Sequence, residues 1–442
     1  MGSGFTLPNL AKVSSDGLRV LVKVLGLFGI ASQMTAAELP RLFNVTQPFR
    51  VFSERAVATE SAKMLPKGTL FMQRVELNAQ ALGGDVSVTL DGQSRVAKFV
   101  DSYIRPGEGT TFFYSTGKDS SGKDEMISVV TTFFDGRPAI ANVVIDRKSY
   151  YISPEGSHHV AALNAARQVK DIVHPVAEIL AQMPPALRSA YLSAATTAVP
   201  SRRRVCCTFY QTIAMVTAVD QSYLNEVGPK DGQTAEQRVT SLIAHQYDRL
   251  NAALYNSGAG DYRFVNKATA YVNVPQGTNV ISWATAHMSP VNVLRRDNNA
   301  AAAVLLFQNS PEAALNSPDP NVPIIADFNI AVAGEYIADS DDGTVWDIIH
   351  EIGHLLAVDH NPENALSPLT GVYAFRHSQC DCPAGVQFAV SYNACDKFLT
   401  RLEIYPGQRA KDMGYNINLD ESNAVRTMLM MLPRFAQGFN QL

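Results

Sequence analysis

The chain has 442 residues, of which 46% are hydrophobic, and its formal net charge is −4. This length predicts about two domains with sizeable cores. The small negative charge, without a basic stripe, argues against a nucleic-acid-binding protein.

The N-terminus has the layout of a secretory signal peptide. Arg19 and Lys23 precede a short apolar run over residues 24–31, and Thr35-Ala36-Ala37 fits a small-x-small cleavage site. We therefore expect a signal peptide over residues 1–37 and a secreted or periplasmic protein. An uncleaved anchor or a buried helix is the alternative. No later stretch is long and apolar enough to span a membrane, so no stable span is expected after signal removal.

Residues 38–165 are expected to form a β-rich domain. Val86–Leu90 alternates in polarity, and the runs 126–134 and 139–145 flank Asp135-Gly136, which is a hairpin signal. His158-His159 lies in the tail of this domain. An exposed polar pair is the simpler interpretation there, and a metal role is the alternative.

A helix is expected to begin near residue 160, and residues 166–204 are interpreted as a helical segment and linker because prolines interrupt an Ala-rich stretch. Arg202-Arg203-Arg204 ends this segment. Such a triplet is either a solvated linker or, in a secreted zymogen, a processing site.

Residues 205–442 change to an α/β pattern. Thr212–Val219 is a continuous apolar run typical of a buried strand, and a helix is expected from about 235 to 256, with a stop at Gly258. One face of this helix carries an apolar stripe, formed by Val239, Leu242, Ile243, Tyr247, Leu250 and Leu254. Further strands are expected within Tyr262–Val274, Ala301–Phe307 and Pro323–Tyr336.

The interpretation of the cysteines depends on export. The chain has five, namely Cys206, Cys207, Cys380, Cys382 and Cys395. The last three cluster in a loop-like stretch, which in an exported protein predicts local disulfide bonds, with a metal-binding Cys380-x-Cys382 as the alternative. No cysteine lies between Ala37 and Arg204, so a thiol-type latency switch cannot operate if processing occurs at the arginines.

The chemistry is concentrated in His350-Glu351-Ile352-Gly353-His354. A helix is expected to begin near Thr344, because Thr344 and Asp347 resemble a capping box, and His350 and His354 would then project from one face. Two neutral imidazoles in that arrangement suit zinc, and Glu351 is displaced from them and suited to act as general base toward a water molecule. His360, ten residues after His350, supplies a third ligand.

The pattern His350-Glu351-x-x-His354-x-x-Ala357-x-x-His360 resembles the zinc signature of the metzincins, and the chain looks most like the bacterial reprolysin-like (ADAM-type) metalloproteases. The resemblance extends over most of the chain, through Thr212–Asp220, Asn256–Gly258, Phe264-Val265, Tyr373–Arg376 and Ser391-Tyr392.

The resemblance implies an α+β fold: a metzincin-type catalytic domain with a twisted, mostly parallel five-stranded sheet and helices, and an irregular C-terminal subdomain after His360. A β-rich pro-region precedes it. The implied cofactor is Zn²⁺ and the implied substrates are proteins or peptides. An edge strand within Ala331–Ile337 would bind extended substrate by β-augmentation. Tyr392 matches a tyrosine that, in some metzincins, ligates the metal or stabilises the oxyanion; a packed aromatic is the alternative.

Three positions depart from the family pattern. Ala357 replaces the glycine after the zinc helix, Val390 stands where the Met-turn methionine is expected, and Asn361 replaces an acidic residue. The changes at Ala357 and Val390 motivate an alternative function, a catalytically weak or inactive metzincin that acts as a protein-binding scaffold. A third hypothesis keeps the enzyme but replaces His360 with Glu421 as ligand, as in gluzincins.

Overall fold

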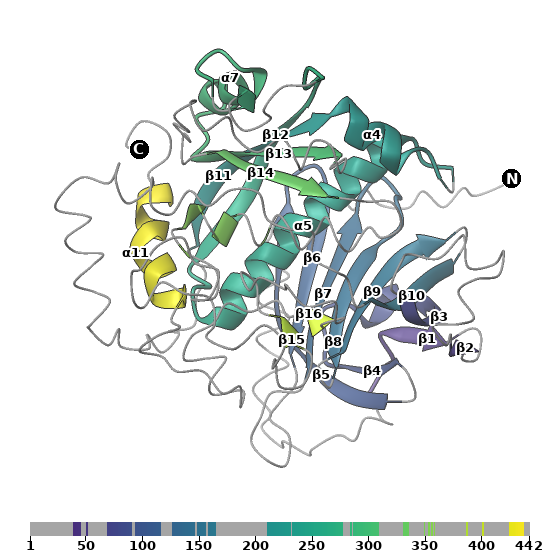
Figure 1. Ribbon diagram of the computed structural model, residues 1–442. Coiled ribbons are helices and arrows are strands. Elements are labelled where there is room, and N and C mark those ends of the chain that lie inside the picture. The colour runs from purple at the N-terminus through teal and green to yellow at the C-terminus, as the bar shows by residue number, and fades with distance from the viewer. Residues whose placement is uncertain are drawn as a thin grey trace, which may run out of the picture.

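Strands dominate the first half of the described chain, and a parallel sheet with helices follows them (Figure 1). The computed structural model describes residues 39–45, 50–51, 69–90, 93–115, 126–145, 148–155, 158–164, 210–230, 232–276, 283–284, 286–308, 330–335, 349, 352–353, 355–356, 358, 386–387, 400–401 and 424–436. The predicted signal peptide, the segment 166–204 and all five cysteines lie outside these ranges.

The first unit is a ten-stranded antiparallel sheet in the order β1-β3-β10-β9-β8-β7-β6-β5-β4, with β2 paired to β3. Its strands are β1 (Phe43–Val45), β2 (Arg50–Val51), β3 (Thr69–Leu77), β4 (Val86–Leu90), β5 (Gln93–Arg105), β6 (Gly109–Ser115), β7 (Met126–Phe133), β8 (Ile140–Ile145), β9 (Lys148–Glu155) and β10 (His158–Asn164). A short 3-10 turn, η3 (Ala79–Ala81), joins β3 to β4.

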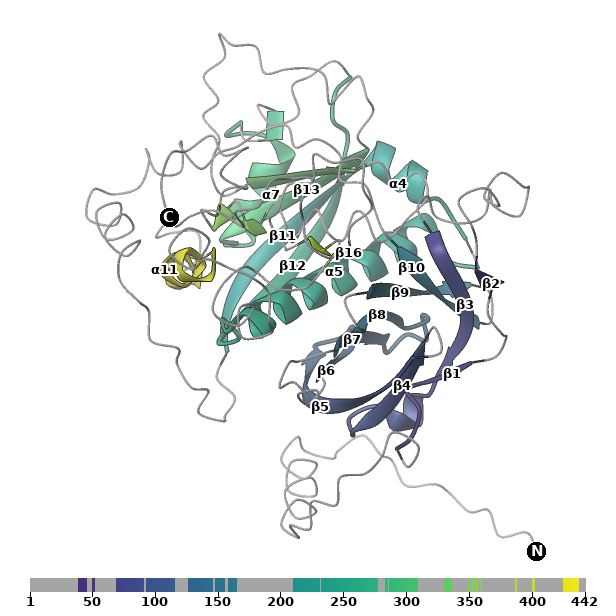
Figure 2. The same cartoon turned by 60° about the horizontal axis from the view of Figure 1, so that its bottom comes forward.

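This sheet closes on itself. Strands β4 to β10 follow one another as a meander, and β10 then pairs with β3. The remaining gap between β3 and β4 is bridged by the segment before β1: Leu42 N donates to Ser87 O at 2.8 Å, and Ser87 N donates to Pro40 O at 2.9 Å. We call this unit the barrel, and Figure 2 shows its strands curving around a common interior. Apolar side chains fill that interior, including Phe43, Val88 and Val143.

Several strand predictions are confirmed, and one helix prediction is wrong. β4 has the predicted bounds, and β7 and β8 form the predicted hairpin, in which Gly136 takes a φ of 81°. The helix expected near residue 160 is not found at its start, because residues 158–164 form β10. That strand contains His158 and His159, so this pair belongs to the strand that closes the barrel rather than to a tail.

The second unit, which we call the α/β unit, contains a four-stranded parallel sheet in the order β12-β11-β13-β14. Its strands are β11 (Gln211–Asp220), β12 (Tyr262–Val272), β13 (Ala302–Gln308) and β14 (Ile330–Glu335), and its helices are α4 (Gln221–Val227), α5 (Ala235–Ser257), α7 (Pro290–Asp297) and α11 (Ala424–Ala436). These elements confirm the strands and the long helix expected between residues 205 and 336. A short parallel pair, β15 (Val386–Gln387) and β16 (Thr400–Arg401), forms a separate sheet, and β16 contacts β9 of the barrel.

The two faces of this sheet pack against different helices. Along β11, Ile213, Met215 and Val219 face the cluster that contains α5 and α11, whereas Val216 and Ala218 face the cluster that contains α7. This alternation is the period of two that a strand imposes. None of the helices in the described ranges is long and apolar enough to cross a membrane.

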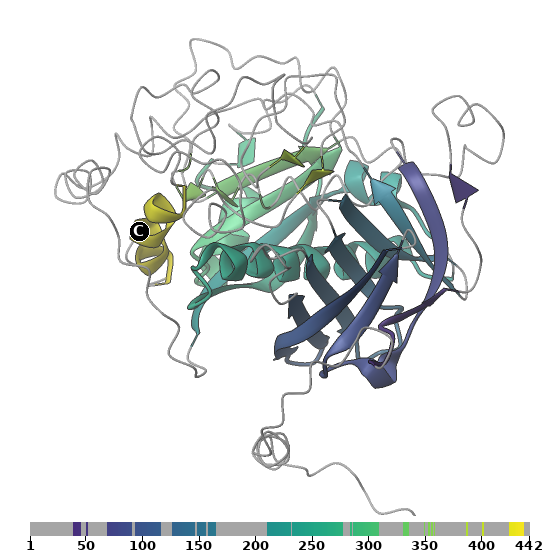
Figure 3. The same cartoon turned by 90° about the horizontal axis from the view of Figure 1, so that it is seen from below.

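Helix α5 is fixed at both ends and along its length. Thr234 and Gln237 form a capping box at its N-terminus, and Gly258 ends it in the left-handed conformation with a φ of 91°. Asn251 clips the helix to β12, because its amide nitrogen donates to Phe264 O at 2.9 Å and its oxygen accepts from Phe264 N at 2.8 Å. Figure 3 shows α5 running between the parallel sheet and the barrel.

The metzincin-type architecture stays a prediction. The part of the chain that the structure describes contains a four-stranded parallel sheet, whereas the resemblance implies five strands, and β14 is the last strand in the described order. β14 covers most of the Ala331–Ile337 stretch expected to bind substrate, and its described pairing is parallel to β13.

Candidate functional site

The predicted site residues themselves lie outside the described residues. This holds for the proposed zinc ligands His350, His354 and His360, for the proposed general base Glu351, and for Tyr392. Ala357, Asn361, Val390 and Glu421 are outside them as well. The structure does describe residues interleaved with the motif.

The interleaved residues are buried apolar side chains. Ile349, Ile352 and Leu356 have no exposed surface, Leu355 is 2% exposed, and Val358 is fully buried. Positions 349, 352 and 356 have the spacing of one helical face. One side of the motif segment is therefore built into the protein core.

Backbone hydrogen bonds show where the helical turn of the motif segment ends. Leu356 N donates to Ile352 O at 3.0 Å, which is the bond of an α-helix, and Val358 N donates to Gly353 O at 3.1 Å. Leu356 N also donates to Gly353 O at 3.1 Å, a 3-10-type bond of the kind that closes the last turn of a helix. The helical turn therefore stops within a few residues of His354 in the sequence.

The core around this segment is shared with two helices. Ile349 and Ile352 belong to the same apolar cluster as Tyr247 and Leu250 of α5 and Met428 of α11. The motif segment therefore packs on the sheet face that α5 and α11 also cover.

The donor atoms of the motif have the chemistry that a zinc ion needs. Three neutral imidazoles with a carboxylate nearby are a common catalytic zinc set. Among the residues that the structure describes, no group of three His, Cys, Asp or Glu side chains could hold a metal ion. That result does not bear on the motif, whose four polar residues are outside those ranges.

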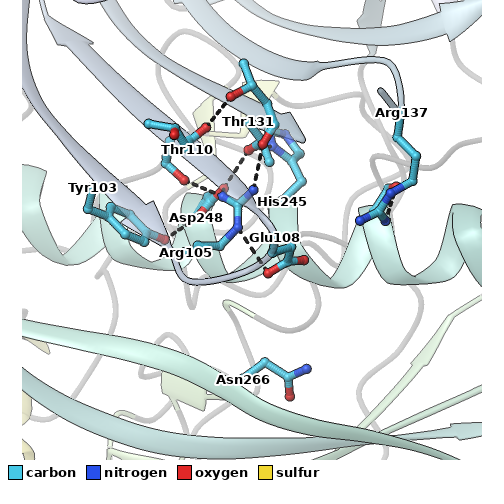
Figure 4. A network of polar contacts seen from close by, with 12 residues as sticks. Tyr103, Arg105, Glu108, Thr110, Thr131, Arg137, His245, Asp248 and Asn266 are labelled. Atoms are coloured by element: carbon cyan, nitrogen blue, oxygen red, sulfur yellow. Dashed lines mark hydrogen bonds and ion pairs between the residues drawn. The ribbon is translucent and has the colours of Figure 1, made fainter. Parts of the chain in front are cut away.

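A second polar cluster joins the barrel to α5 (Figure 4). Its centre is Asp248 of α5, which is fully buried. Arg105 Nη1 of β5 donates to Asp248 Oδ2 at 2.5 Å, and Thr131 Oγ1 of β7 donates to the same oxygen at 2.7 Å. The hydroxyl of Tyr103 donates to the other carboxylate oxygen. A buried carboxylate is tolerated because all three barrel side chains satisfy it.

The pKa values of both Arg105 and Tyr103 are raised in this cluster. Burial lowers the pKa of Arg105, but its polar neighbours, first among them the charge of Asp248, together outweigh burial, so the guanidinium pKa is raised. Burial, with the charge of Asp248, raises the pKa of Tyr103 far above its usual value. Tyr103 is therefore a neutral hydrogen-bond donor and Arg105 a fixed cation.

His245, also on α5, is held neutral. It is fully buried, and burial, together with the charges of Arg249 and Arg105, lowers its pKa well below 6.5. Its Nδ1 lies 2.8 Å from Thr131 Oγ1. Because the Thr131 hydroxyl hydrogen goes to Asp248, Nδ1 carries the histidine proton and donates it to Thr131. His245 Nε2 is then a buried acceptor that has no hydrogen-bond partner among the residues the structure describes.

A third cluster lies at the start of the α/β unit. Arg263 of β12 donates to Asp101 of β5 at 2.7 Å, and its guanidinium lies 3.4 Å from the ring centroid of Tyr210 and 4.4 Å from that of Tyr103. The Tyr210 hydroxyl donates to the same carboxylate. The cation is therefore stacked on aromatic rings and paired at the same time.

These interface residues have no signal in the sequence. His245 and Asp248 lie on the polar side of a helix whose apolar stripe is elsewhere, and that pattern is typical of a solvent-exposed face. Only knowledge of the strands packed on them reveals their burial.

Comparison with known protein families gives no match, and neither does comparison with curated proteins. One solved structure, described as "Structure of a chaperone-substrate complex", is similar at a TM-score of 0.36 and 16% sequence identity. The match covers 52% of this chain and 36% of that one, so this chain spans about a third of its length. A likeness of this degree carries no argument about fold or function.

Proposed function

We propose that the chain is a secreted zinc-dependent endopeptidase. The observation that carries this proposal is the His350-Glu351-x-x-His354 pattern with His360, interleaved with apolar side chains that are buried in the core of the α/β unit. An α-helix turns by about 100° per residue, so positions 350 and 354 are expected on the side opposite to 349, 352 and 356. That arrangement would leave the imidazoles free to bind metal.

His350, His354 and His360 would hold the zinc ion. When bound, zinc acts as a Lewis acid toward the scissile carbonyl and lowers the pKa of a water molecule toward about 7. Glu351 would take a proton from the attacking water and pass it to the leaving amine. Tyr392 would donate a hydrogen bond to the developing oxyanion.

The remaining parts of the proposal follow from the same resemblance. Substrates would be proteins or peptides, and β14 is the proposed strand for pairing with an extended substrate. The barrel would be the pro-region, and the N-terminal signal pattern would direct export.

The test is hydrolysis of an unstructured protein by the purified chain, with and without a metal chelator. We expect cleavage that the chelator abolishes and added zinc restores. Glu351→Ala is expected to lower the rate by about 10²–10⁴-fold, the usual contribution of a general base. Glu236→Ala, which removes an exposed carboxylate at the start of α5 and outside the motif, is the control and should keep the activity.

Two results would contradict the proposal. Cleavage that survives in Glu351→Ala would exclude this carboxylate as the base. A chain that binds zinc but cleaves nothing would favour the scaffold alternative that Ala357 and Val390 motivate.

A further inference from the structure

The barrel and the α/β unit each have a core of their own. The interior cluster of the barrel contains only residues 42–152, and both clusters around the parallel sheet contain only residues from 213 onward. Units with separate cores are the ones that fold independently and associate through a surface. The contact between the two units is therefore an interface rather than a shared core.

Among the residues that the structure describes, apolar side chains meet across this interface in two small clusters. In one, Phe133, Ile140 and Tyr151 of the barrel contact Ala244 of α5. In the other, Phe113 contacts Ala252 of α5. Alanine on the helix side leaves little apolar surface exposed if the units separate, so the α/β unit tolerates an undocked state.

Polar anchors provide the rest of the contact. The Asp248 cluster and the Arg263 cluster are both built from Arg, Tyr and Asp side chains contributed by the two units. Buried Arg and Tyr side chains are the groups that dominate binding energy in protein interfaces. At the edge of the contact, Arg137 Nη1 donates to Ser241 Oγ at 2.9 Å.

We propose that this interface is a self-sufficient docking surface, and that the barrel stays bound to α5 as a non-covalent partner after the chain is cut between the two units. The specific recognition is of the Asp248 carboxylate by Arg105, Tyr103 and Thr131. This proposal does not depend on proteolytic activity, and it gives processing at Arg202-Arg203-Arg204 a definite product: a two-chain complex.

The experiment uses the full chain with a site-specific protease sequence inserted between Ala195 and Thr196, in a Glu351→Ala background that prevents self-cleavage. After cutting, the two fragments are expected to elute together from size exclusion at micromolar concentration. Asp248→Asn removes the charge that Arg105 binds and is expected to weaken association by at least about 30-fold, as loss of one member of a buried charge pair does.

Matched variants make the result decisive. Glu236→Gln removes a carboxylate charge from the exposed start of α5 and should leave association unchanged. Arg263→Gln tests the second anchor and should weaken association even if Asp248→Asn fails to fold. The proposal is overturned if the cut wild-type fragments separate or precipitate, or if Asp248→Asn and Arg263→Gln bind as tightly as Glu236→Gln.

Discussion

At the residue scale, the Asp248–Arg105 pair places two opposite charges in the interior of the molecule. The carboxylate is fully buried and the guanidinium side chain is 10% exposed. Burying such a pair costs desolvation energy of about the same size as the attraction between the two charges. The net contribution of the pair to stability is therefore small. Removing one partner alone is costly because the other charge stays buried.

Asp248→Ala is therefore expected to destabilise the folded chain by about 3–5 kcal/mol. The combination of Asp248→Ala with Arg105→Met should recover part of this loss, because no unpaired charge remains. Urea unfolding of the two single variants and the double variant measures the coupling. Strictly additive losses would contradict an interaction between the two side chains.

His245 predicts a pH dependence of stability. Its folded-state pKa lies below the ordinary value of 6.5, so the unfolded chain binds a proton that the folded chain does not. The stabilising contribution is complete above pH 6.5 and declines as the pH falls below it, by up to about 1.4 kcal/mol per pH unit. The positive charges of Arg249 and Arg105 oppose protonation of His245. Asp248 is already satisfied by three donors, and Thr131 and Tyr151 are neutral.

This effect is measured as the change in urea unfolding midpoint between pH 7 and pH 5. Wild type should lose more stability over that interval than His245→Gln, which keeps a polar group but does not titrate. An identical pH slope in wild type and His245→Gln would show that the histidine does not titrate differently on folding.

At the scale of elements, the start of β6 depends on the absence of a side chain. A Cβ atom on Gly109 would lie 1.8 Å from Thr132 O of β7 and 2.8 Å from Arg105 Nη2. That carbonyl is also the acceptor for Arg105 Nη2 at 3.0 Å. Close approach of β6 to β7 therefore positions the arginine that reaches α5.

Gly109→Ala is expected to destabilise the chain by about 1–3 kcal/mol, because the strand must shift to relieve the contact. Gly84→Ala is the matched control, since a Cβ there meets nothing within 4 Å. Thermal unfolding of both variants checks the difference. Equal stability of the two would show that β6 has room to move.

Local patterns predicted most of these elements, and long-range pairing decided the others. Helix α5 follows from its apolar stripe and the stop at Gly258, and β4 from its alternation. The Ala-rich stretch from residue 160 predicts a helix, yet pairing with both β3 and β9 makes residues 158–164 a strand. Strand preference depends on neighbours that a single sequence does not identify. The closure of the barrel was unpredictable for the same reason.

At the scale of the whole molecule, the sequence is informative about the chemistry and silent about the interface. The spacing of His350, His354 and His360 predicts a zinc site from local geometry alone. The docking of the barrel on α5 depends on side chains from β5, β7 and β12 that meet only in the fold. The buried Ile349, Ile352 and Leu356 support a fixed helical segment at the motif, while the family and the activity remain proposals.

The position of α11 makes the identity of the third ligand a sharp question. This helix begins at Ala424, three residues after Glu421, and packs in the same apolar cluster as Ile349 and Ile352. A carboxylate ligand from that region is therefore the alternative that must be separated from His360.

Metal content of the purified chain tests the central claim most directly. Elemental analysis should find one zinc ion per wild-type chain, retention of zinc in Glu351→Ala and Glu421→Ala, and loss of zinc in His350→Ala and His360→Ala. Circular dichroism of each variant confirms that the fold is kept. A wild-type chain without stoichiometric zinc, or a His360→Ala chain that keeps it while Glu421→Ala loses it, would contradict the three-histidine zinc site.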